Sequence, residues 1–308
     1  MALWRSAHAI GRSTSVLDQS LAVLSLGPLA PVARRRRRIE SKWGKIIGDL
    51  SERDNMMIPV YVINLPDEPT RFEQVASQIR RLRFLEAIRV ESVAGRLLSD
   101  MATLALTRNQ WAKNYKGALG CFLGHTRAWE IFVTSKAEFA LIVEDDVSIN
   151  NAELLEHLVF PESCDIAFCN DRTCYVDGGS SIANDAPYEF RAVEPVFELV
   201  ARVKQGIGSD GYILTRRGAM RLLEFVSIDS LFSHVDLRMA AYCLEQGTCT
   251  RIEAIDSIFA KNVVAMRRTY QSSHHLSGYS FSPSITHHLG GESRRDREDR
   301  AGLTSQSI

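Results

Sequence analysis

The chain lacks a long apolar run, an excess of either charge sign and any close pair of cysteines, and each absence excludes a class of protein. Proline or charge interrupts the apolar stretches well before the roughly 20 residues that a membrane-spanning helix needs. Lys plus Arg and Asp plus Glu number 37 each, so no overall positive field favours a nucleic-acid partner. The six cysteines form no C-x-x-C pair, which argues against a zinc knuckle or a dithiol redox centre.

Three common signatures of nucleotide-binding and hydrolytic enzymes are also missing. The chain has no Walker loop and no G-x-S-x-G elbow. Its glycine-rich stretch 206–211 does not follow a strand with a later acidic partner, as a dinucleotide-binding loop would. The sequence therefore supports neither a dinucleotide site nor the chemistry of the other two motifs.

The composition of the chain is that of a folded domain preceded by a basic arm. With 308 residues, of which 45% are hydrophobic, it can bury a real core. Residues 1–57 carry ten Lys and Arg against five Asp and Glu, and we expect this arm to be a disordered extension. The alternatives are a transit segment, or peripheral contact of the run from Arg34 to Arg38 with anionic lipid at the inner face of the cytoplasmic membrane. With the disordered extension or the membrane contact, the expected location is cytoplasmic.

The C-terminal segment is rich in Ser, His, Gly and Arg and shows no apolar period. We expect residues 271–308 to be an unstructured tail. The histidine pairs at 274–275 and 287–288 are then expected in solvent rather than on a metal ion.

Residues 58–270 show the alternation of apolar runs and amphipathic stretches that is typical of one α/β domain. Strands are predicted at 58–65, 88–93, 139–143, 165–169 and 211–215. Helices are predicted at 69–82, at 117–136 and after residue 215. The near-continuous apolar strands favour a sheet that helices cover on both faces.

The strand at 139–143 runs directly into Glu144, Asp145 and Asp146. Ligands of open α/β sheets bind at the carboxyl ends of strands. Alternation along a strand would place Glu144 and Asp146 on one face and Asp145 on the other. Hard cations such as Mg²⁺ or Mn²⁺ would relieve the repulsion among three carboxylates and bridge to phosphates. The alternative, on these residues alone, is that the acids cap the next helix or turn.

Several motifs follow one another along the chain: Ile63-Asn-Leu with Arg71, Gly117 to His125 with Trp129, the acidic strand 141–147, Gly208 to Thr215 followed by Gly218-Ala-Met, and Val235-Asp236. In order and spacing they resemble the motifs of glycosyltransferase family 25, the sugar transferases of lipooligosaccharide assembly. The family often has Ser in place of Gly124 and Pro in place of His234, which leaves the acceptor preference open.

The resemblance, which covers roughly residues 58–265, implies a GT-A fold, a Rossmann-like mixed sheet that binds nucleotide-diphosphate sugars. It further implies a donor such as UDP-galactose, Mn²⁺ or Mg²⁺ held by the acidic triplet, and inversion at the anomeric carbon. The acceptor implied is a saccharide, lipid-linked or part of the lipopolysaccharide core.

The resemblance also points to residues that would contact the donor. Asn64, Leu65 and Arg71 follow the first strand, where a uracil edge or a diphosphate could be bound. Gly117 and Gly120 open a helix whose N-terminal amides favour anions, and Lys116 stands beside them. The plain alternative for Arg71 and Lys116 is a solvated surface charge.

An inverting transfer needs a base that takes the proton of the acceptor hydroxyl. Asp236 is the first candidate and Asp210 the second, although Asp236 would also suit a helix cap. His125 is a third candidate for ligand contact or catalysis, against the alternative of a satisfied core histidine on the same helical side as Trp129.

The sequence therefore favours a metal-dependent inverting transferase that moves a hexose, galactose first, from a UDP-sugar to a saccharide. A transferase-like protein that binds a sugar nucleotide or acts as a scaffold without turnover is the main alternative. A metal-dependent phosphohydrolase is the third hypothesis, but it would normally need more metal ligands than one strand end offers.

Overall fold

The computed structural model of the chain describes residues 57–173, 187–204 and 206–290. The arm predicted to be disordered, including Arg34 to Arg38, lies outside the described residues except for Met57. The end of the predicted tail, 291–308, lies outside them as well.

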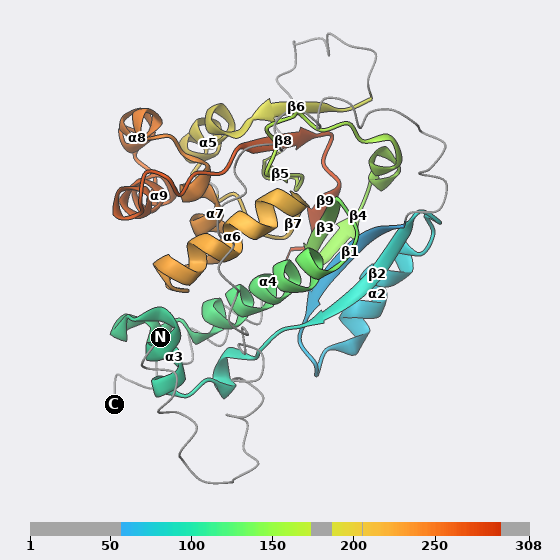
Figure 1. The fold of residues 1–308 in the computed structure, drawn as a ribbon, viewed down its shortest axis with the longest axis horizontal. Helices are drawn as coiled ribbons and strands as arrows, with labels where there is room; N and C mark the ends of the chain where they lie inside the picture. The colour runs from blue at the N-terminus through green and yellow to red at the C-terminus, as the bar shows by residue number, and fades with distance from the viewer. Residues whose placement is uncertain (1–56, 174–186, 205, 291–308) are drawn as a thin grey trace, which may run out of the picture. The chain divides into compact units, whose positions relative to one another are not determined.

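The core of the described part is a seven-stranded sheet with the order β2-β1-β3-β7-β5-β8-β6 (Figure 1). The strands are β1 (Ile58–Asn64), β2 (Leu85–Glu91), β3 (Phe139–Glu144), β5 (Ile166–Phe168), β6 (Glu189–Ala192), β7 (Gly211–Thr215) and β8 (Gly278–Ser282). Neighbouring strands are parallel except at β7 and β6, which run antiparallel to their partners. The predicted mixed α/β sheet is therefore confirmed.

Helices cover both faces of this sheet, because alternate residues of each central strand point in opposite directions. Helix α2 (Pro69–Ile79) buries Val75 and Ile79 in one core cluster with Val60 and Val62 of β1. Helix α4 (Lys116–Thr134) lies on the other face, where Phe132 packs on the ring of Tyr61. The other helices are α3 (Asp100–Thr107), α5 (Val193–Arg202), α6 (Arg216–Asp229), α7 (Val235–Cys243), α8 (Gln246–Glu253) and α9 (Ile258–Thr269).

The prediction of an unstructured tail after Tyr270 is wrong for residues 271–290. Strand β8 lies inside the sheet between β5 and β6, and β9 (Thr286–His288) pairs with β4 (Val147–Ile149). Phe281 is fully buried among the rings of Tyr188 and Phe190. Polar residues interrupt the apolar pattern of this strand, so the sequence alone does not reveal it. The buried Ser280 is tolerated because its hydroxyl donates to the Thr173 carbonyl at 2.6 Å.

Replacing Phe281 by Ala should therefore lower the free energy of unfolding by about 3–5 kcal/mol, the cost of a large cavity in a core. Urea denaturation of the full chain measures this. The control is Leu289→Ala, whose side chain is 61% exposed and whose replacement should change stability by less than about 0.5 kcal/mol. Equal, small effects of the two changes would show that β8 is not part of the core.

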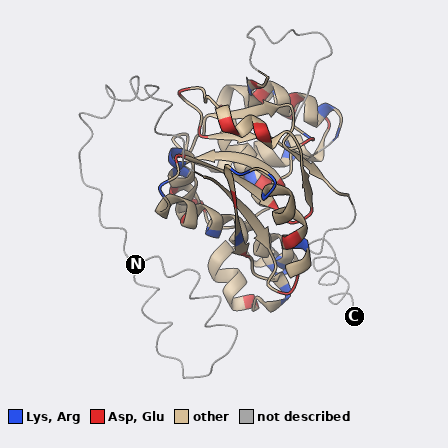
Figure 2. Ribbon diagram, turned by 90° about the vertical axis from the view of Figure 1, so that its right-hand side faces the viewer, with Lys and Arg blue, Asp and Glu red and all other residues tan. Residues whose placement is uncertain are grey.

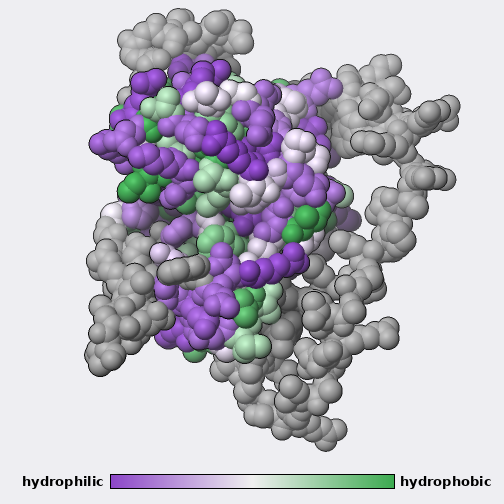
Figure 3. Space-filling model, turned by 90° about the vertical axis from the view of Figure 1, so that its left-hand side faces the viewer, coloured by the Kyte–Doolittle hydropathy of each residue, from purple (hydrophilic) through white to green (hydrophobic). Residues whose placement is uncertain are grey.

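Figures 2 and 3 show the distribution of charge and hydropathy on two sides of the molecule. Acidic and basic residues are interspersed on the side shown in Figure 2, and the face in Figure 3 is mostly hydrophilic with small separate hydrophobic patches. Within the described residues, none of the helices combines the length and apolarity needed to cross a membrane.

The sheet topology brings polar residues from four strands to one edge. The parallel strands β1 and β3 end there at Asn64 and Glu144. Because β7 is antiparallel to β3 and pairs Gly211 with Val143, the residues just before β7, Ser209 and Asp210, reach the same edge. Strand β5 delivers the segment that begins at Asn170 to it as well.

Candidate active site

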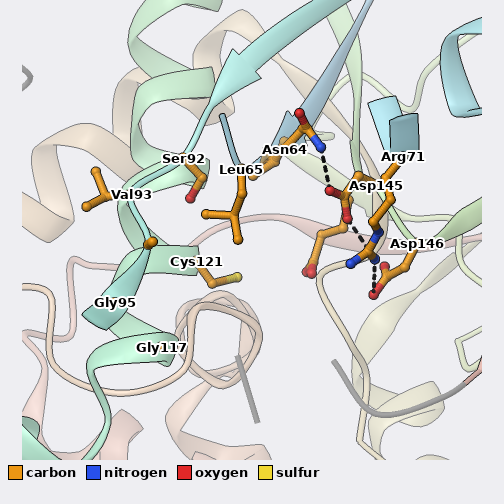
Figure 4. A pocket seen from close by; sticks show the side chains of 13 residues that line it. Asn64, Leu65, Arg71, Ser92, Val93, Gly95, Gly117, Cys121, Asp145 and Asp146 are labelled. Carbon is orange, nitrogen blue, oxygen red and sulfur yellow. Dashed lines mark hydrogen bonds and ion pairs between the residues drawn. The ribbon is translucent and has the colours of Figure 1, made fainter. Parts of the chain in front are cut away.

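A pocket opens at this edge of the sheet between the acidic turn after β3 and the start of α4 (Figure 4). The space between its walls is about 600 Å³, including open solvent at its mouth. Its wall consists of Ile63, Asn64, Leu65, Arg71, Ser92, Val93, Ala94, Gly95, Gly117, Cys121, Glu144, Asp145 and Asp146. The three predicted acids, Asn64, Leu65, Arg71 and Gly117 are thus brought together.

Arg71 bridges two of the acids on one side of the pocket. Its guanidinium lies 2.8 Å from Asp145 Oδ1 and 3.3 Å from Asp146 Oδ2. Asn64 Nδ2 donates to Asp145 Oδ2 at 2.7 Å, while Asn64 Oδ1 accepts from Arg89 Nε at 2.8 Å. Asn64 and Arg71 therefore contact the acids themselves.

The predicted alternation of the acids is wrong, because β3 ends at Glu144 and the next two residues form a turn. Glu144 Oε1 accepts from Ser209 Oγ at 2.5 Å and lies 3.5 Å from His125 Nε2. Asp145 and Asp146 instead meet Arg71 together. The turn leads into strand β4 at Val147, so the acids do not cap a helix.

Positive charge beyond that of Arg71 would further stabilise the acidic cluster. Burial raises the pKa of Asp145 to about 6, against the hydrogen bond from Asn64 and the charge of Arg71, and the other two acids add to the rise. Asp146 Oδ1 is buried without a hydrogen-bond partner among the described residues. Carboxylate oxygens are the ligands that Mg²⁺ and Mn²⁺ prefer, so the donor set fits such a cation.

His288 is a residue of this site that the sequence interpretation missed. It lies on β9, 30% exposed, with Nε2 3.6 Å from Asp146 Oδ2, and the Leu289 amide donates to the Asp146 carbonyl at 2.9 Å. The Asp146 carboxylate raises the pKa of the His288 imidazole, and partial burial opposes the rise. The prediction that the pair 287–288 is simply solvated is therefore wrong for His288. Only the pairing of β9 with β4 brings it here, and no local sequence signal reveals that pairing. The same prediction for the pair 274–275 is wrong for His274, which is 4% exposed and has its Nδ1 2.7 Å from Asp229 Oδ2.

Gly117 and Gly120, at the start of α4, have different surroundings. Gly117 lines the pocket, but a Cβ atom on Gly120 would lie 2.2 Å from the Val93 carbonyl oxygen. The small size of Gly120 therefore serves close backbone packing rather than ligand approach. Lys116 pairs with Asp100 at 2.8 Å and is not part of the pocket wall.

His125 is fully buried on α4, as the core interpretation of this residue predicts. Its Nδ1 lies 2.8 Å from the hydroxyl oxygen of Tyr212, and its Nε2 faces Glu144. It therefore reaches the pocket through Glu144 and not directly.

Neither candidate base lies on the pocket wall. Asp210 is 2% exposed, and Arg172 Nη2 lies 2.5 Å from its Oδ1. Burial raises the pKa of Asp210, and the charge of Arg172 opposes that rise. Asp236 is half-buried in the first turn of α7, where His234 occupies the N-cap position, so Asp236 is not the cap.

The Arg172–Asp210 pair leaves no room for a side chain at Gly208. Gly208 adopts a φ of +64°, and a Cβ atom there would lie 2.3 Å from both the Arg172 guanidinium and Asp210 Oδ1. Gly208→Ala should therefore destabilise the fold by at least about 1 kcal/mol, from the left-handed backbone alone. Gly206→Ala is the matched control, since no atom lies within 4 Å of its added Cβ. Urea denaturation of both variants checks the difference, and equal stabilities would contradict it.

A family model, a curated protein and a solved structure are similar to this chain. The model of glycosyltransferase family 25 (LPS biosynthesis protein) matches residues 57–239. A Haemophilus influenzae protein named "Putative glycosyltransferase" is 27% identical over 184 residues, which are 57% of this chain and 60% of that protein. The match thus spans less than two thirds of that relative's length.

A solved structure, a glycosyltransferase involved in the glycosylation of the major capsid of PBCV-1, is 10% identical with a TM-score of 0.34. It aligns with 80% of this chain and 99% of its own. The assignment rests instead on the family model, which covers more than half of the sequence and includes Asn64, Arg71, the acidic triplet and Asp236. The chain belongs to glycosyltransferase family 25.

Proposed function

We propose that this protein transfers a hexose, galactose first, from a UDP-sugar to a saccharide acceptor of the lipopolysaccharide core or a lipid-linked glycan. The observation that carries the proposal is the open pocket at the carboxyl edge of the sheet, walled on one side by three carboxylates. The matched family segments build this pocket, and its position is where α/β sheets bind ligands.

The two sides of the pocket suit the two ends of a nucleotide-diphosphate sugar. Asn64, Leu65 and Arg71 offer hydrogen-bond donors and a guanidinium on the side of β1. The N-terminal end of α4 reaches the opposite wall at Gly117, where the positive end of the helix dipole favours a diphosphate.

Asp145 and Asp146 would hold Mn²⁺ or Mg²⁺, with His288 beside Asp146. A bound divalent cation neutralises the charge that develops on a diphosphate leaving group. Arg71 already contacts both carboxylates, so in this proposal it exchanges one or both contacts for the donor's phosphates. Glu144 accepts a hydrogen bond from Ser209 instead. In this proposal it binds the donor and not the cation.

We assign the base to Asp236. The acceptor oxygen attacks the anomeric carbon from the face opposite the nucleotide, its proton passes to a carboxylate, and the bond to the diphosphate breaks. Asp210 is poorly suited, because Arg172 holds it in a buried ion pair. Asp236 lies in the first turn of α7 and is close enough to Arg172 for its charge to favour the charged guanidinium.

A screen of the full chain against nucleotide sugars tests the proposal. Transfer from one UDP-hexose with Mn²⁺ present, lost on chelation with EDTA and restored by added Mn²⁺, is the expected result. Activity that persists unchanged in EDTA would overturn the metal dependence. Absence of any transfer or donor hydrolysis across the panel would overturn the enzymatic function.

A sugar-nucleotide-binding protein without turnover is the second candidate, favoured by the fact that neither proposed base lies on the pocket wall. A rise in melting temperature with UDP and Mn²⁺ would support binding in both cases, by mass action. Donor hydrolysis or transfer separates the enzyme from the binding protein.

For the run from Arg34 to Arg38, sedimentation with liposomes of anionic lipid tests the predicted membrane contact.

A further inference from the structure

A chain of hydrogen bonds runs through the core from α4 to the pocket. Trp129 Nε1 donates to the hydroxyl oxygen of Tyr212 at 2.8 Å, and that hydroxyl lies 2.8 Å from His125 Nδ1. Tyr212 is on β7 and stacks on the imidazole with ring centroids 5.7 Å apart. All three side chains are fully buried, so each hydrogen in the chain needs a partner within the protein.

Counting hydrogens fixes which imidazole nitrogen carries the proton. An indole N–H can only donate, so the Tyr212 oxygen accepts from Trp129. Burial raises the pKa of the Tyr212 phenol, which therefore keeps its own hydrogen. The described residues offer that hydrogen one acceptor, His125 Nδ1. A neutral imidazole that accepts at Nδ1 carries its proton on Nε2.

The Nε2 proton is directed at Glu144. Nε2 is buried with no hydrogen-bond partner, and Glu144 Oε1 lies 3.5 Å away, slightly beyond ordinary hydrogen-bond length. The same carboxylate oxygen accepts from Ser209 Oγ. Such contacts are often long in a ligand-free site and shorten when the ligand binds.

The same proton argues against a metal ion at this position. Ligand atoms of Cys121, His125 and Glu144 lie within 4.8 Å of one another, an arrangement that could hold a cation. A protonated Nε2 has no lone pair for a metal. The cluster is therefore better explained as a hydrogen-bonded support for Glu144.

We propose that His125 is a positioning residue: the Trp129–Tyr212 pair fixes its Nε2 proton, which holds Glu144 on the pocket wall to accept a hydroxyl of the donor. Two residues of α4, one of β7 and the last residue of β3 thus form one unit. The use of Glu144 for the donor rests on the proposed function, whereas the position of the proton does not.

The proton itself can be observed by nitrogen NMR of the full chain labelled with ¹⁵N-histidine. We expect the histidine signals that are lost in His125→Gln to show an unprotonated Nδ1 and an Nε2 that carries the hydrogen. Tyr212→Phe should change the Nδ1 shift of that residue. A wild-type His125 protonated at Nδ1 would overturn the inference without any assay of activity.

Two substitutions of His125 then test which imidazole nitrogen supports donor binding. The amide of Gln can place an N–H near the position of Nε2, whereas Asn reaches only the position of Nδ1. We expect His125→Asn to weaken binding of the UDP-sugar, or raise its KM, about ten- to hundredfold. Its kcat should change less, and His125→Gln should stay close to the wild type. Calorimetric titration of the donor with Mn²⁺, on variants with checked melting temperatures, measures the difference.

The outcomes distinguish this inference from the proposed function. If wild type binds the donor and the Asn and Gln variants bind it equally, the positioning role of His125 is wrong while the function stands. If wild type binds no UDP-sugar, the proposed function and this use of Glu144 both fall, and the NMR result still decides the tautomer. If both variants unfold, Tyr212→Phe takes their place: it should weaken donor binding, and unchanged binding would overturn the proposal.

Discussion

Replacing Asp146 by Asn is expected to lower the rate of sugar transfer about 100- to 1,000-fold, the usual loss when one group that stabilises developing charge is removed. Asp146 carries the buried oxygen that has no hydrogen-bond partner, and it lies between Arg71 and His288. An amide keeps the shape of the side chain but supplies half the ligand oxygens and no charge. The cation and the diphosphate should both bind more weakly.

The measurement combines transfer assays with Mn²⁺ binding, followed by the electron paramagnetic resonance of the free ion. Asp256→Asn is the matched control, because this Asp is 86% exposed and its ion pair with Lys261 lies on the surface. It should behave as wild type in both assays. An Asp146→Asn protein with unchanged melting temperature, full transfer and wild-type Mn²⁺ affinity would refute the role given to the acidic turn.

The central strands could be predicted because each is a short apolar run that the sheet buries. Strand β1 ends at Asn64 and β3 at Glu144, each within one residue of the predicted end, and β7 spans the predicted residues. Parallel strands end at the same edge, and this rule of topology explains why Asn64 lies beside the acids in the structure. These inferences depend on local pattern and on one general rule of topology.

The partners of the site residues could not be predicted in the same way. The exact end of β3 decides that Asp145 and Asp146 turn toward Arg71 while Glu144 turns toward Ser209, and a shift of one residue would reverse this. Sequence position gives no such precision. The contacts of Arg71 with Asp145 and Asp146, and that of Ser209 with Glu144, each join residues more than sixty positions apart.

The C-terminal strands were missed because their polar residues are satisfied only by distant partners. Ser280 is buried because a carbonyl of Thr173 accepts its hydrogen, and His288 lies at the site because β9 pairs with β4. In isolation the same residues are typical of a solvated tail. Burial of polar side chains depends on tertiary contacts that composition does not encode.

Replacing Asp236 by Asn is expected to lower kcat about 100- to 10,000-fold, the contribution of a general base, while the affinity for the donor stays the same. Asp236 is outside the wall that surrounds the donor in our proposal, so its loss should affect proton transfer and not donor binding. Single-turnover assays with saturating UDP-sugar measure the first effect, and calorimetric titration measures the second.

Two further variants make the assignment decisive. Glu194→Gln removes an acid from the first turn of another helix, α5, and should leave kcat unchanged, which controls for the general effect of a first-turn charge. Asp210→Asn leaves Arg172 without its buried partner, so it should lower the melting temperature. If Asp236→Asn keeps its kcat while a folded Asp210→Asn loses it, the base is Asp210, and its ion pair with Arg172 must open when the acceptor binds.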